Sequence, residues 1–281
     1  MSDDLRIEVW RVPSPLPKPV VTAVGLYDTF FHLVVVIHVD GLEGWGYSGM
    51  ATAGLLDQAA ERTLGLLDAL PPRLDALLTV EHFEQTWPGA SSDTAGKGAA
   101  NAIALAAWDL AGRRMGLPCA NLWGRRPATE SLDCYGSGFF LDASIEDLAA
   151  EAEHYRTLGF RRVKMRTGLP MQEDLDRLEI VRASFPDPNS IAVDAFHSWS
   201  PRQALDFVER APGSLLWVED ATPYPDLGGI STAGAPIAAG ESLETTSALT
   251  ALRSAARVDF ALLDVGRLGG PMRFLSAAAV L

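Results

Sequence analysis

The stretch IAVD (Ile191–Asp194) is followed at steady intervals by LLWVE (Leu215–Glu219), IAAGE (Ile237–Glu241) and FALLD (Phe260–Asp264), and this series decides the fold. Each segment is a short apolar run that ends in an acidic residue. Successive acids are separated by about the length of one strand and one helix. Strands that alternate with helices pair in parallel, because each crossover returns to the same edge. The series therefore predicts an α/β fold with four acidic side chains at the carboxyl ends of successive strands, where ligands gather in such folds.

The same alternation extends back to residue 132. Counting from there, we expect strands at Leu132–Gly136, Arg162–Arg166, Ile191–Asp194, Leu215–Glu219, Ile237–Glu241 and Phe260–Asp264, and helices at Ser144–Leu158, Gln172–Ala183, Pro201–Arg210 and Thr245–Ala256. A complete eight-stranded barrel has roughly 250 residues. Residues 126–281 are therefore expected to form a barrel domain that is incomplete at its C-terminal end, with two exposed sheet edges.

Residues 1–125 have a different texture and are expected to form a separate, mixed α+β domain. Proline cannot donate a hydrogen bond inside a sheet, so the Pro-rich part of this region predicts a loop or an edge strand. Expected are strands at Arg6–Val12 and His32–Val39, the loop or edge at Pro13–Pro19, a turn at Gly41–Gly46, and helices at Leu55–Leu70 and Lys97–Met115.

Composition excludes several classes of protein. The chain has 23 Lys and Arg against 36 Asp and Glu, a formal charge of −13, which argues against a nucleic-acid partner. No secretory signal and no membrane-spanning apolar segment is visible. Two cysteines without a metal-type pairing favour a reducing cytoplasm. An anionic substrate stays open, because a bound metal can reverse the local charge of a site.

Acidic side chains that converge on one mouth need compensation. Two like charges ~4 Å apart repel by about 4 kcal/mol at an effective dielectric constant near 20. Either protons or a cation must therefore neutralise some of them. Carboxylate oxygens suit Mg²⁺ or Mn²⁺, and without a Cys/His cluster zinc is not favoured. A single acid after a strand is more often a helix N-cap or a solvated residue, so the residues alone leave both interpretations open.

Two basic residues end the second predicted strand of the barrel domain. Lys164 and Arg166 in the sequence VKMR lie two positions apart and therefore face the same side. They could bind a substrate carboxylate, or they could balance the acids. Lys164 could also act as a base if burial lowered its pKa, whereas a guanidinium stays protonated. Aromatic residues such as Trp199 and Trp217 are open between pocket and core.

Seven short motifs, in their order and spacing, resemble the mandelate racemase/muconate lactonizing enzyme group of the enolase superfamily over nearly the whole chain. These motifs are GLEGWG (Gly41–Gly46), AWDLAG (Ala107–Gly112), VKMR (Val163–Arg166), VD (Val193–Asp194), VED (Val218–Asp220), AGE (Ala239–Glu241) and LDVGRLGG (Leu263–Gly270).

This resemblance implies a capping α+β domain over a TIM-type (β/α) barrel, of which about six repeats are present. It implies Mg²⁺ held by Asp194, Glu219 and Glu241. The implied chemistry is abstraction of a proton α to a carboxylate, with stabilisation of the resulting enolate. The resemblance also implies a homo-oligomer, and specificity loops from the capping domain around residues 14–29 and 46–53.

The chain departs from the family pattern at its presumed catalytic residues. Arg166 replaces a lysine that is often a base in relatives, so Lys164 is left to polarise the substrate or to serve as a substitute base. Asp264 resembles the mandelate racemase branch, in which this aspartate pairs with a histidine on a seventh strand that the chain does not reach. His197 follows the third barrel strand, far from the sixth, and is expected to be a loop residue rather than that partner.

The resemblance leads to three hypotheses about function. Dehydration of an acid sugar is favoured, with Lys164, Arg166 and Asp264 as the catalytic residues and no nucleic acid or membrane as partner. The first alternative is a racemase, epimerase or cycloisomerase of the same family. The second is a catalytically inactive relative with a binding or structural role.

Overall fold

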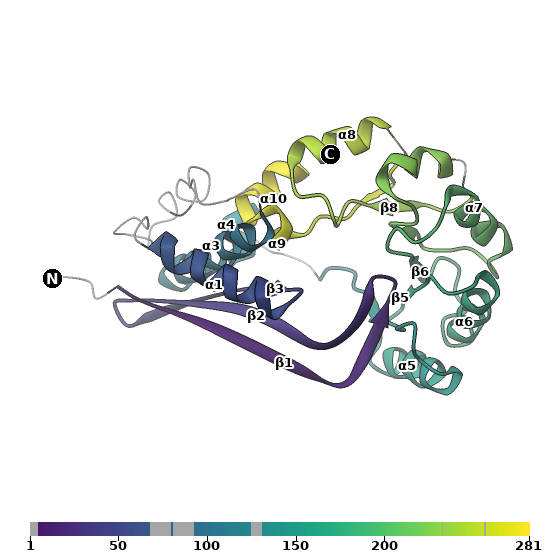
Figure 1. Ribbon diagram of the computed structural model, residues 1–281, viewed down its shortest axis with the longest axis horizontal. Coiled ribbons are helices and arrows are strands. Elements are labelled where there is room, and N and C mark those ends of the chain that lie inside the picture. Colours follow the sequence, from purple (N-terminus) through teal and green to yellow (C-terminus); the bar gives the residue numbers. More distant parts are fainter. Residues whose placement is uncertain (1–4, 68–79, 81–92, 125–130, 232, 256) are drawn as a thin grey trace.

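The computed structural model describes residues 5–67, 80, 93–124, 131–231, 233–255 and 257–281. Two sheets, each with its own buried core, organise the chain (Figure 1). In chain order the elements are β1 (Arg6–Thr22), β2 (Gly25–Val39), β3 (Leu42–Met50), α1 (Ala53–Leu67), α3 (Thr94–Met115), α4 (Cys119–Gly124), β4 (Gly136–Gly138), α5 (Ile145–Thr157), β5 (Val163–Arg166), α6 (Met171–Ser184), β6 (Ile191–Asp194), α7 (Pro201–Arg210), β7 (Val218–Glu219), η1 (Tyr224–Ile230), β8 (Ile237–Ala239), α8 (Thr246–Ala255), β9 (Phe260–Ala261), α9 (Val265–Leu268) and α10 (Pro271–Ala278).

The N-terminal sheet is antiparallel, in the order β1-β2-β3, and α1 and α3 pack against it. The Pro-rich stretch is part of β1, which lies at the edge of the sheet, and the pairing register shifts between Pro15 and Val20. An edge strand tolerates proline because one row of its N–H groups needs no ladder partner. Of the two predicted alternatives for this stretch, the edge strand is therefore confirmed.

Two glycines of the GLEGWG motif lie inside β3, so the predicted turn over residues 41–46 is wrong beyond Gly41. They are needed because α3 packs directly on the strand. A Cβ added to Gly44 would lie 2.1 Å from Ala106 O, and one added to Gly46 would lie 2.0 Å from Ala102 O. Helix α3 is capped by Asp93 and ends at Gly116 in the left-handed conformation.

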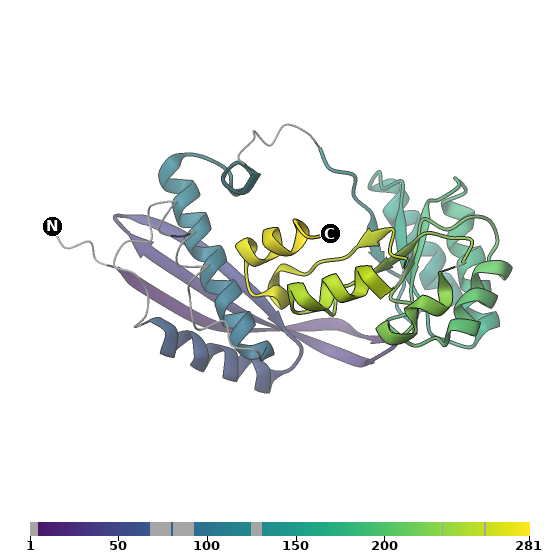
Figure 2. The ribbon, with the colours of Figure 1, turned by 90° about the horizontal axis from the view of Figure 1, so that it is seen from above.

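The second sheet contains six parallel strands in sequence order, β4 to β9, with helices on its outer side (Figure 2). Between the strands lie α5, α6, α7 and α8, each within one or two residues of the predicted range, and the short helix η1 follows β7. This is the arrangement of a TIM-type barrel, partly present in the chain. The predicted fold class is confirmed.

The first barrel strand differs from the prediction. The apolar run Leu132–Gly136 does not form it, since Leu132 is 88% exposed, and β4 is instead Gly136–Gly138. Helix α5 lies so close that a Cβ on Gly136 would be 2.4 Å from the ring of Tyr155. Close packing therefore selects a glycine-rich strand, which has no apolar signature in the sequence.

The later strands end earlier than predicted. Strand β8 stops at Ala239, and Gly240 has a φ of 124°, a conformation that favours glycine. Strand β9 covers only Phe260–Ala261, and the chain then runs extended to Asp264.

Two other predictions lie outside the described residues: the domain boundary between residues 125 and 126, and the end of the helix predicted over Leu55–Leu70. Among the described helices, none has the length and apolar character needed to cross a membrane.

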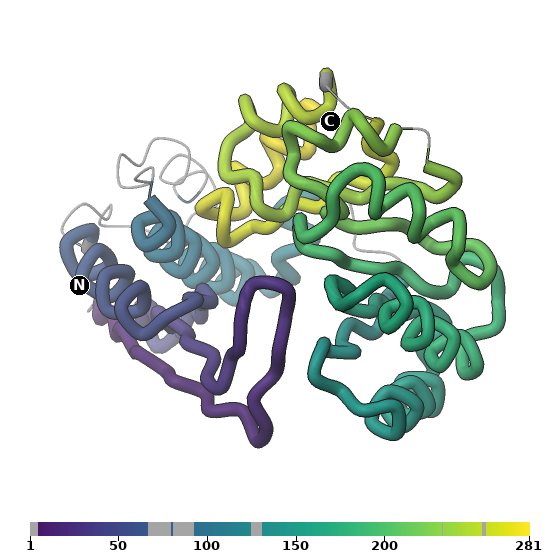
Figure 3. The backbone as a smooth tube through the Cα atoms, turned by 45° about the vertical axis from the view of Figure 1, so that its right-hand side comes forward, coloured from purple at the N-terminus to yellow at the C-terminus, as the bar shows by residue number. Residues whose placement is uncertain are grey.

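Within the described residues, the two domains meet where α3 packs on α9 and α10 and at the tip of the β1–β2 hairpin. Lys97 on α3 is only 7% exposed. It donates over 2.6 Å to the carboxylate of Glu244, which lies in the loop after β8. At the other contact, the tip of the β1–β2 hairpin lies against the segment after β4, where Leu141 N donates to Val21 O over 2.9 Å (Figure 3). The capping hairpin and α3 thus reach the barrel domain at separate points.

Helix α6 buries one carboxylate in the barrel domain. Asp174 is fully buried, and its Oδ2 accepts a hydrogen bond from Gly168 N over 2.8 Å. Its Oδ1 has no hydrogen-bond partner among the described atoms. Burial raises the pKa of Asp174 to about 6, against the opposing effects of the backbone hydrogen bond and of Arg177.

We expect Asp174 to make stability pH-dependent. Between about pH 4 and pH 6 the folded protein keeps a proton that the unfolded chain has lost, so this carboxyl contributes less stability as the pH rises through that window. Relative to Asp174→Asn, the wild type should lose up to about 3 kcal/mol of unfolding free energy from pH 4 to pH 7. Urea titrations over this range measure the difference. Asp176→Asn, an exposed site on the same helix, should show no such slope.

Candidate metal and substrate site

A lysine ammonium lies between two buried carboxylates at the centre of the barrel domain. Lys164 on β5 donates to Asp194 Oδ2 over 2.9 Å and to Glu219 Oε1 over 2.5 Å. Asp194 ends β6 and Glu219 ends β7, and the ladder pairs these two residues with each other. All three residues are at most 5% exposed. Their proximity follows from the parallel register, which brings the ends of adjacent strands to the same edge.

Further hydrogen bonds orient both carboxylates. Arg166 Nη1 donates to Asp194 Oδ2 over 2.6 Å, and Phe196 N donates to Asp194 Oδ1 over 3.1 Å. Trp217 Nε1 donates to Glu219 Oε2 over 2.9 Å. The sequence-based expectation that Lys164 and Arg166 share a face is therefore confirmed. Both carboxylates have a fixed orientation before any ligand binds.

Burial and neighbouring charges shift the pKa values of both Glu219 and Lys164. Burial and the charge of Asp194 raise the pKa of Glu219 to about 7, although Lys164 and Trp217 oppose the rise. Burial alone disfavours the ammonium, but Asp194 and Glu219 outweigh this effect and raise the pKa of Lys164 above its usual value. Lys164 is therefore protonated here. A lysine base would need a lowered pKa, so the role of Lys164 as a substitute base stays a prediction.

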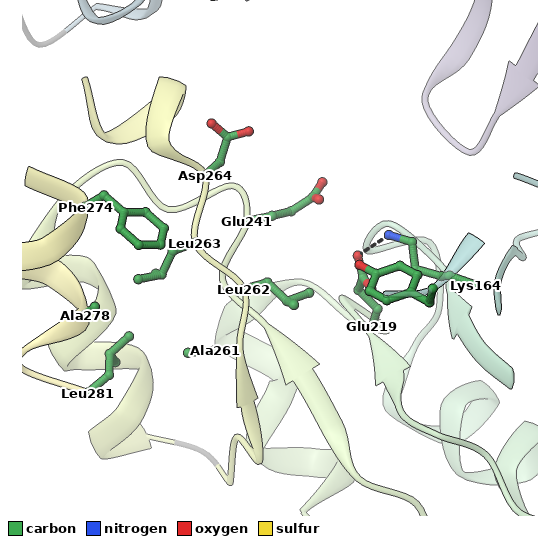
Figure 4. Close-up of a pocket in the computed structure, with 11 residues that line it drawn as sticks. Lys164, Glu219, Glu241, Ala261, Leu262, Leu263, Asp264, Phe274, Ala278 and Leu281 are labelled. Atoms are coloured by element: carbon green, nitrogen blue, oxygen red, sulfur yellow. Dashed lines mark hydrogen bonds and ion pairs between the residues drawn. The ribbon is translucent and has the colours of Figure 1, made fainter. Parts of the chain in front are cut away.

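A cavity of about 540 Å³ opens beside this cluster (Figure 4). Lys164 and Glu219 line one side, and Glu241 and Asp264, on the chain that follows β8 and β9, line another. Three of the four predicted strand-end acids thus face one space. The fourth, Asp194, is 1% exposed and lies against Lys164 and Arg166.

The carboxylate oxygens are of the type that binds a hard divalent cation, but in this arrangement they do not surround a common point. Among the described residues, no three His, Cys, Asp or Glu side chains are close enough together to hold an ion. Glu241 stands apart from the Lys164–Glu219 pair in Figure 4. The ammonium of Lys164 binds the oxygens of Asp194 and Glu219 that a cation would need. The carboxylates of Asp194, Glu219 and Glu241 offer negatively charged oxygen atoms, which are the ligands that Mg²⁺ prefers.

Asp264 has a structural role in addition to its place in the cavity. It is the N-cap of α9, and its Oδ1 accepts a hydrogen bond from Arg267 N over 2.9 Å. His197 does not pair with Asp264. Its Nδ1 lies 2.9 Å from Thr222 O, and its Nε2 lies 3.6 Å from Asp220 Oδ2. His197 is a loop residue after β6, as expected.

Sequence reasoning missed two groups of the site. Tyr135 lines the cavity and meets Trp217 edge to face, with ring centroids 5.2 Å apart. It lies just before β4, where the strand was wrongly placed. The amide of Phe196 is a backbone group, which no sequence pattern marks. Of the two tryptophans left open, Trp217 holds Glu219, whereas Trp199 packs in the core against Phe207.

Two family models match the chain and together span most of it. The model described as the mandelate racemase/muconate lactonizing enzyme N-terminal domain matches residues 6–124. The model described as enolase C-terminal domain-like matches residues 147–281. The chain belongs to the mandelate racemase/muconate lactonizing enzyme family. The resemblance inferred from the motifs is thereby confirmed.

Two curated proteins with similar sequences are enzymes that act on sugar acids. A 3,6-anhydro-alpha-L-galactonate cycloisomerase from Streptomyces coelicolor is 29% identical over 100% of this chain and 79% of the relative. An L-talarate/galactarate dehydratase from Salmonella typhimurium is 31% identical over 84% of this chain and 61% of the relative. The chain thus spans between about three-fifths and four-fifths of these two members.

Solved structures of the family agree with the fold. The L-talarate/galactarate dehydratase from Salmonella typhimurium, liganded with Mg and L-lyxarohydroxamate, superposes with a TM-score of 0.84 at 25% identity. The superposition covers 99% of this chain and 74% of that one. The similarity includes both the capping domain and the barrel domain.

Proposed function

We propose that this chain carries the catalytic site of an Mg²⁺-dependent lyase that dehydrates an acid sugar. The observation that supports this most is the pair of oriented, buried carboxylates, Asp194 and Glu219, beside a cavity that Glu241 and Asp264 also enter. The dehydratase among the relatives supports the reaction class. The substrate would be a small carboxylate.

In this proposal Asp194, Glu219 and Glu241 hold the metal. When bound, Mg²⁺ would supply positive charge where the substrate carboxylate gains negative charge during loss of its α-proton. Lys164 and Arg166 would bind and orient that carboxylate. A cation bound to Asp194 and Glu219 would also neutralise the two carboxylates that now pair with Lys164. The ammonium of Lys164 would then be free to bind the substrate.

Cycloisomerisation is the second candidate, because the relative that matches the whole chain is a cycloisomerase. Both reactions begin with removal of a proton next to a carboxylate. They differ in the bond that breaks afterwards: the bond to a hydroxyl, which departs as water, or a bond within a ring, whose atoms all stay in the product.

Two measurements test the proposal in sequence. Millimolar Mg²⁺ should raise the Tm, because a ligand at 100 times its Kd stabilises the folded state by about 2.7 kcal/mol. Acid sugars incubated in D₂O with protein and Mg²⁺ should then lose the NMR signal of the α-proton. Mass spectrometry of the product then separates the two reactions, because dehydration removes one water from the substrate whereas cycloisomerisation leaves its mass unchanged.

Failure at either step has a distinct meaning. A Tm that does not change when Mg²⁺ is added would contradict the metal site itself and favour a catalytically inactive relative. A clear Mg²⁺ response without proton exchange across an acid-sugar library would keep the metal site and refute the proposed reaction.

Two free thiols, Cys119 and Cys134, agree with the proposed cytoplasmic location. The homo-oligomer remains a prediction.

A further inference from the structure

At the tip of the capping hairpin, Val21 makes two backbone hydrogen bonds to the barrel domain, beside an exposed ion pair of Lys18 with Asp147 over 3.4 Å. The N–H of Val21 donates to Asp142 Oδ1 over 3.0 Å, and its carbonyl accepts from Leu141 N over 2.9 Å. A Cβ on Gly168, in the loop after β5, would lie 3.4 Å from Ala23 Cβ at the same tip. The hairpin thus meets the ends of both β4 and β5, and β5 carries Lys164 and Arg166.

The segment that receives Val21 has an unusual backbone. Phe139, directly after β4, has a φ of 56°, in the left-handed region that bulky side chains rarely adopt. Such a conformation persists only where the surroundings hold it in place. Here Phe139 N donates to Glu151 Oε2 over 3.0 Å, and the fully buried ring packs in the barrel core. A second group, on α6, holds the carbonyl side.

That second group is Arg177, which is 6% exposed. Its guanidinium donates to three consecutive carbonyls, those of Phe139 over 2.8 Å, Phe140 over 3.0 Å and Leu141 over 3.4 Å. A planar guanidinium has several donors in a fixed geometry, so one side chain can define the path of three residues. One turn earlier on α6, Asp174 holds the amide of Gly168.

We propose that Arg177 is a positioning residue that sets the capping hairpin on the barrel. It fixes residues 139–141 in the path that presents Leu141 and Asp142 to Val21. The hairpin tip is then held beside the carboxyl end of β5. This joint stands whether or not the chain is a dehydratase. Its consequence for substrate binding rests on the proposed function.

Hydrogen–deuterium exchange of the full chain tests the joint without any substrate. In Arg177→Met we expect exchange in residues 18–25 and 139–143 to accelerate by about tenfold or more, since the amides of Val21 and Leu141 lose their fixed partners. Arg182→Met is the matched control. Arg182 lies on the same helix and also donates to a carbonyl, Ser214 O over 2.9 Å, but far from the hairpin, which should stay protected.

Two further variants keep the test decisive if Arg177→Met does not fold. Asp142→Ala removes only the acceptor of Val21 N and should accelerate exchange in residues 18–25 alone. Arg177→Lys keeps the charge but loses the fork, and should give an intermediate acceleration. Exchange that rises in residues 139–143 while residues 18–25 keep wild-type protection would overturn the proposal, because Arg177 would then hold only its own loop.

Kinetics add a measurement that a merely structural role would not change. With an active acid sugar and Mg²⁺, Arg177→Met should raise KM by more than it lowers kcat, because the hairpin borders the site rather than the reacting atoms. An equal loss in Arg177→Met and Arg182→Met would indicate general destabilisation and refute positioning. If no substrate is turned over, the proposed function fails while the exchange result still decides the joint.

Discussion

Replacement of Asp194 by asparagine is expected to abolish both the Mg²⁺-dependent rise in Tm and turnover. Asp194 is buried, and its oxygens are fixed by Lys164, Arg166 and Phe196 N. An amide gives a cation one neutral oxygen instead of a negative carboxylate. Loss of several kcal/mol of charge stabilisation should lower kcat by roughly 10³-fold or more.

The control for this variant is Asp206→Asn. Asp206 lies on α7, where its carboxylate is 42% exposed and 3.5 Å from Arg202, so it changes the net charge equally without touching the site. Thermal shifts with and without Mg²⁺, measured on both variants, give the comparison. If Asp194→Asn kept the wild-type Mg²⁺ shift, Asp194 would not be a metal ligand.

Replacement of Lys164 by methionine is expected to have the largest effect on stability. The change leaves Asp194 and Glu219 buried side by side without the ammonium that joins them. Removal of one partner from a buried ion pair typically costs 3–5 kcal/mol, and we expect about that loss of unfolding free energy in the absence of metal. In the same variant Mg²⁺ should raise the Tm by more than it does in the wild type, since it no longer competes with the ammonium.

Lys97→Met separates this effect from the loss of any buried lysine. Lys97 is also buried and paired, with Glu244 over 2.6 Å, but it lies outside the cluster of Asp194 and Glu219. We expect this control to lose stability without gaining sensitivity to Mg²⁺. An unchanged Mg²⁺ response in Lys164→Met would mean that Lys164 and the metal do not share the oxygens of Asp194 and Glu219.

The barrel domain was largely predictable because its signals are local. Apolar runs ending in Asp194 and Glu219 mark buried strands, and Ser144 and Ser200 cap the helices that follow the strands β4 and β6. The first strand was missed for a physical reason. Helix α5 leaves no room for side chains at Gly136, and a strand without apolar residues has no period to detect.

The site was predictable in composition but not in arrangement. The strand-end pattern identified Asp194, Glu219, Glu241 and Asp264, and the cavity indeed gathers three of them. The pattern left open whether Lys164 would bind a substrate or balance the acids, and the structure shows it bridging two of them. That bridge depends on how far each side chain is buried, and burial depends on the whole barrel. Burial lowers the pKa of Lys164, but its anionic neighbours Asp194 and Glu219 outweigh this effect and raise it.

By itself, the sequence determined the alternation of strands and helices, the faces on which Lys164 and Arg166 lie, and the carboxyl ends at which the acids stand. These depend on periodicity and spacing, which are properties of neighbouring residues. Tertiary structure alone decided that Lys164 joins Asp194 to Glu219, 30 and 55 positions away, and that Val21 meets Asp142, 121 positions away. Such contacts depend on strand register and on how two domains dock, and both are set by packing between distant parts of the chain.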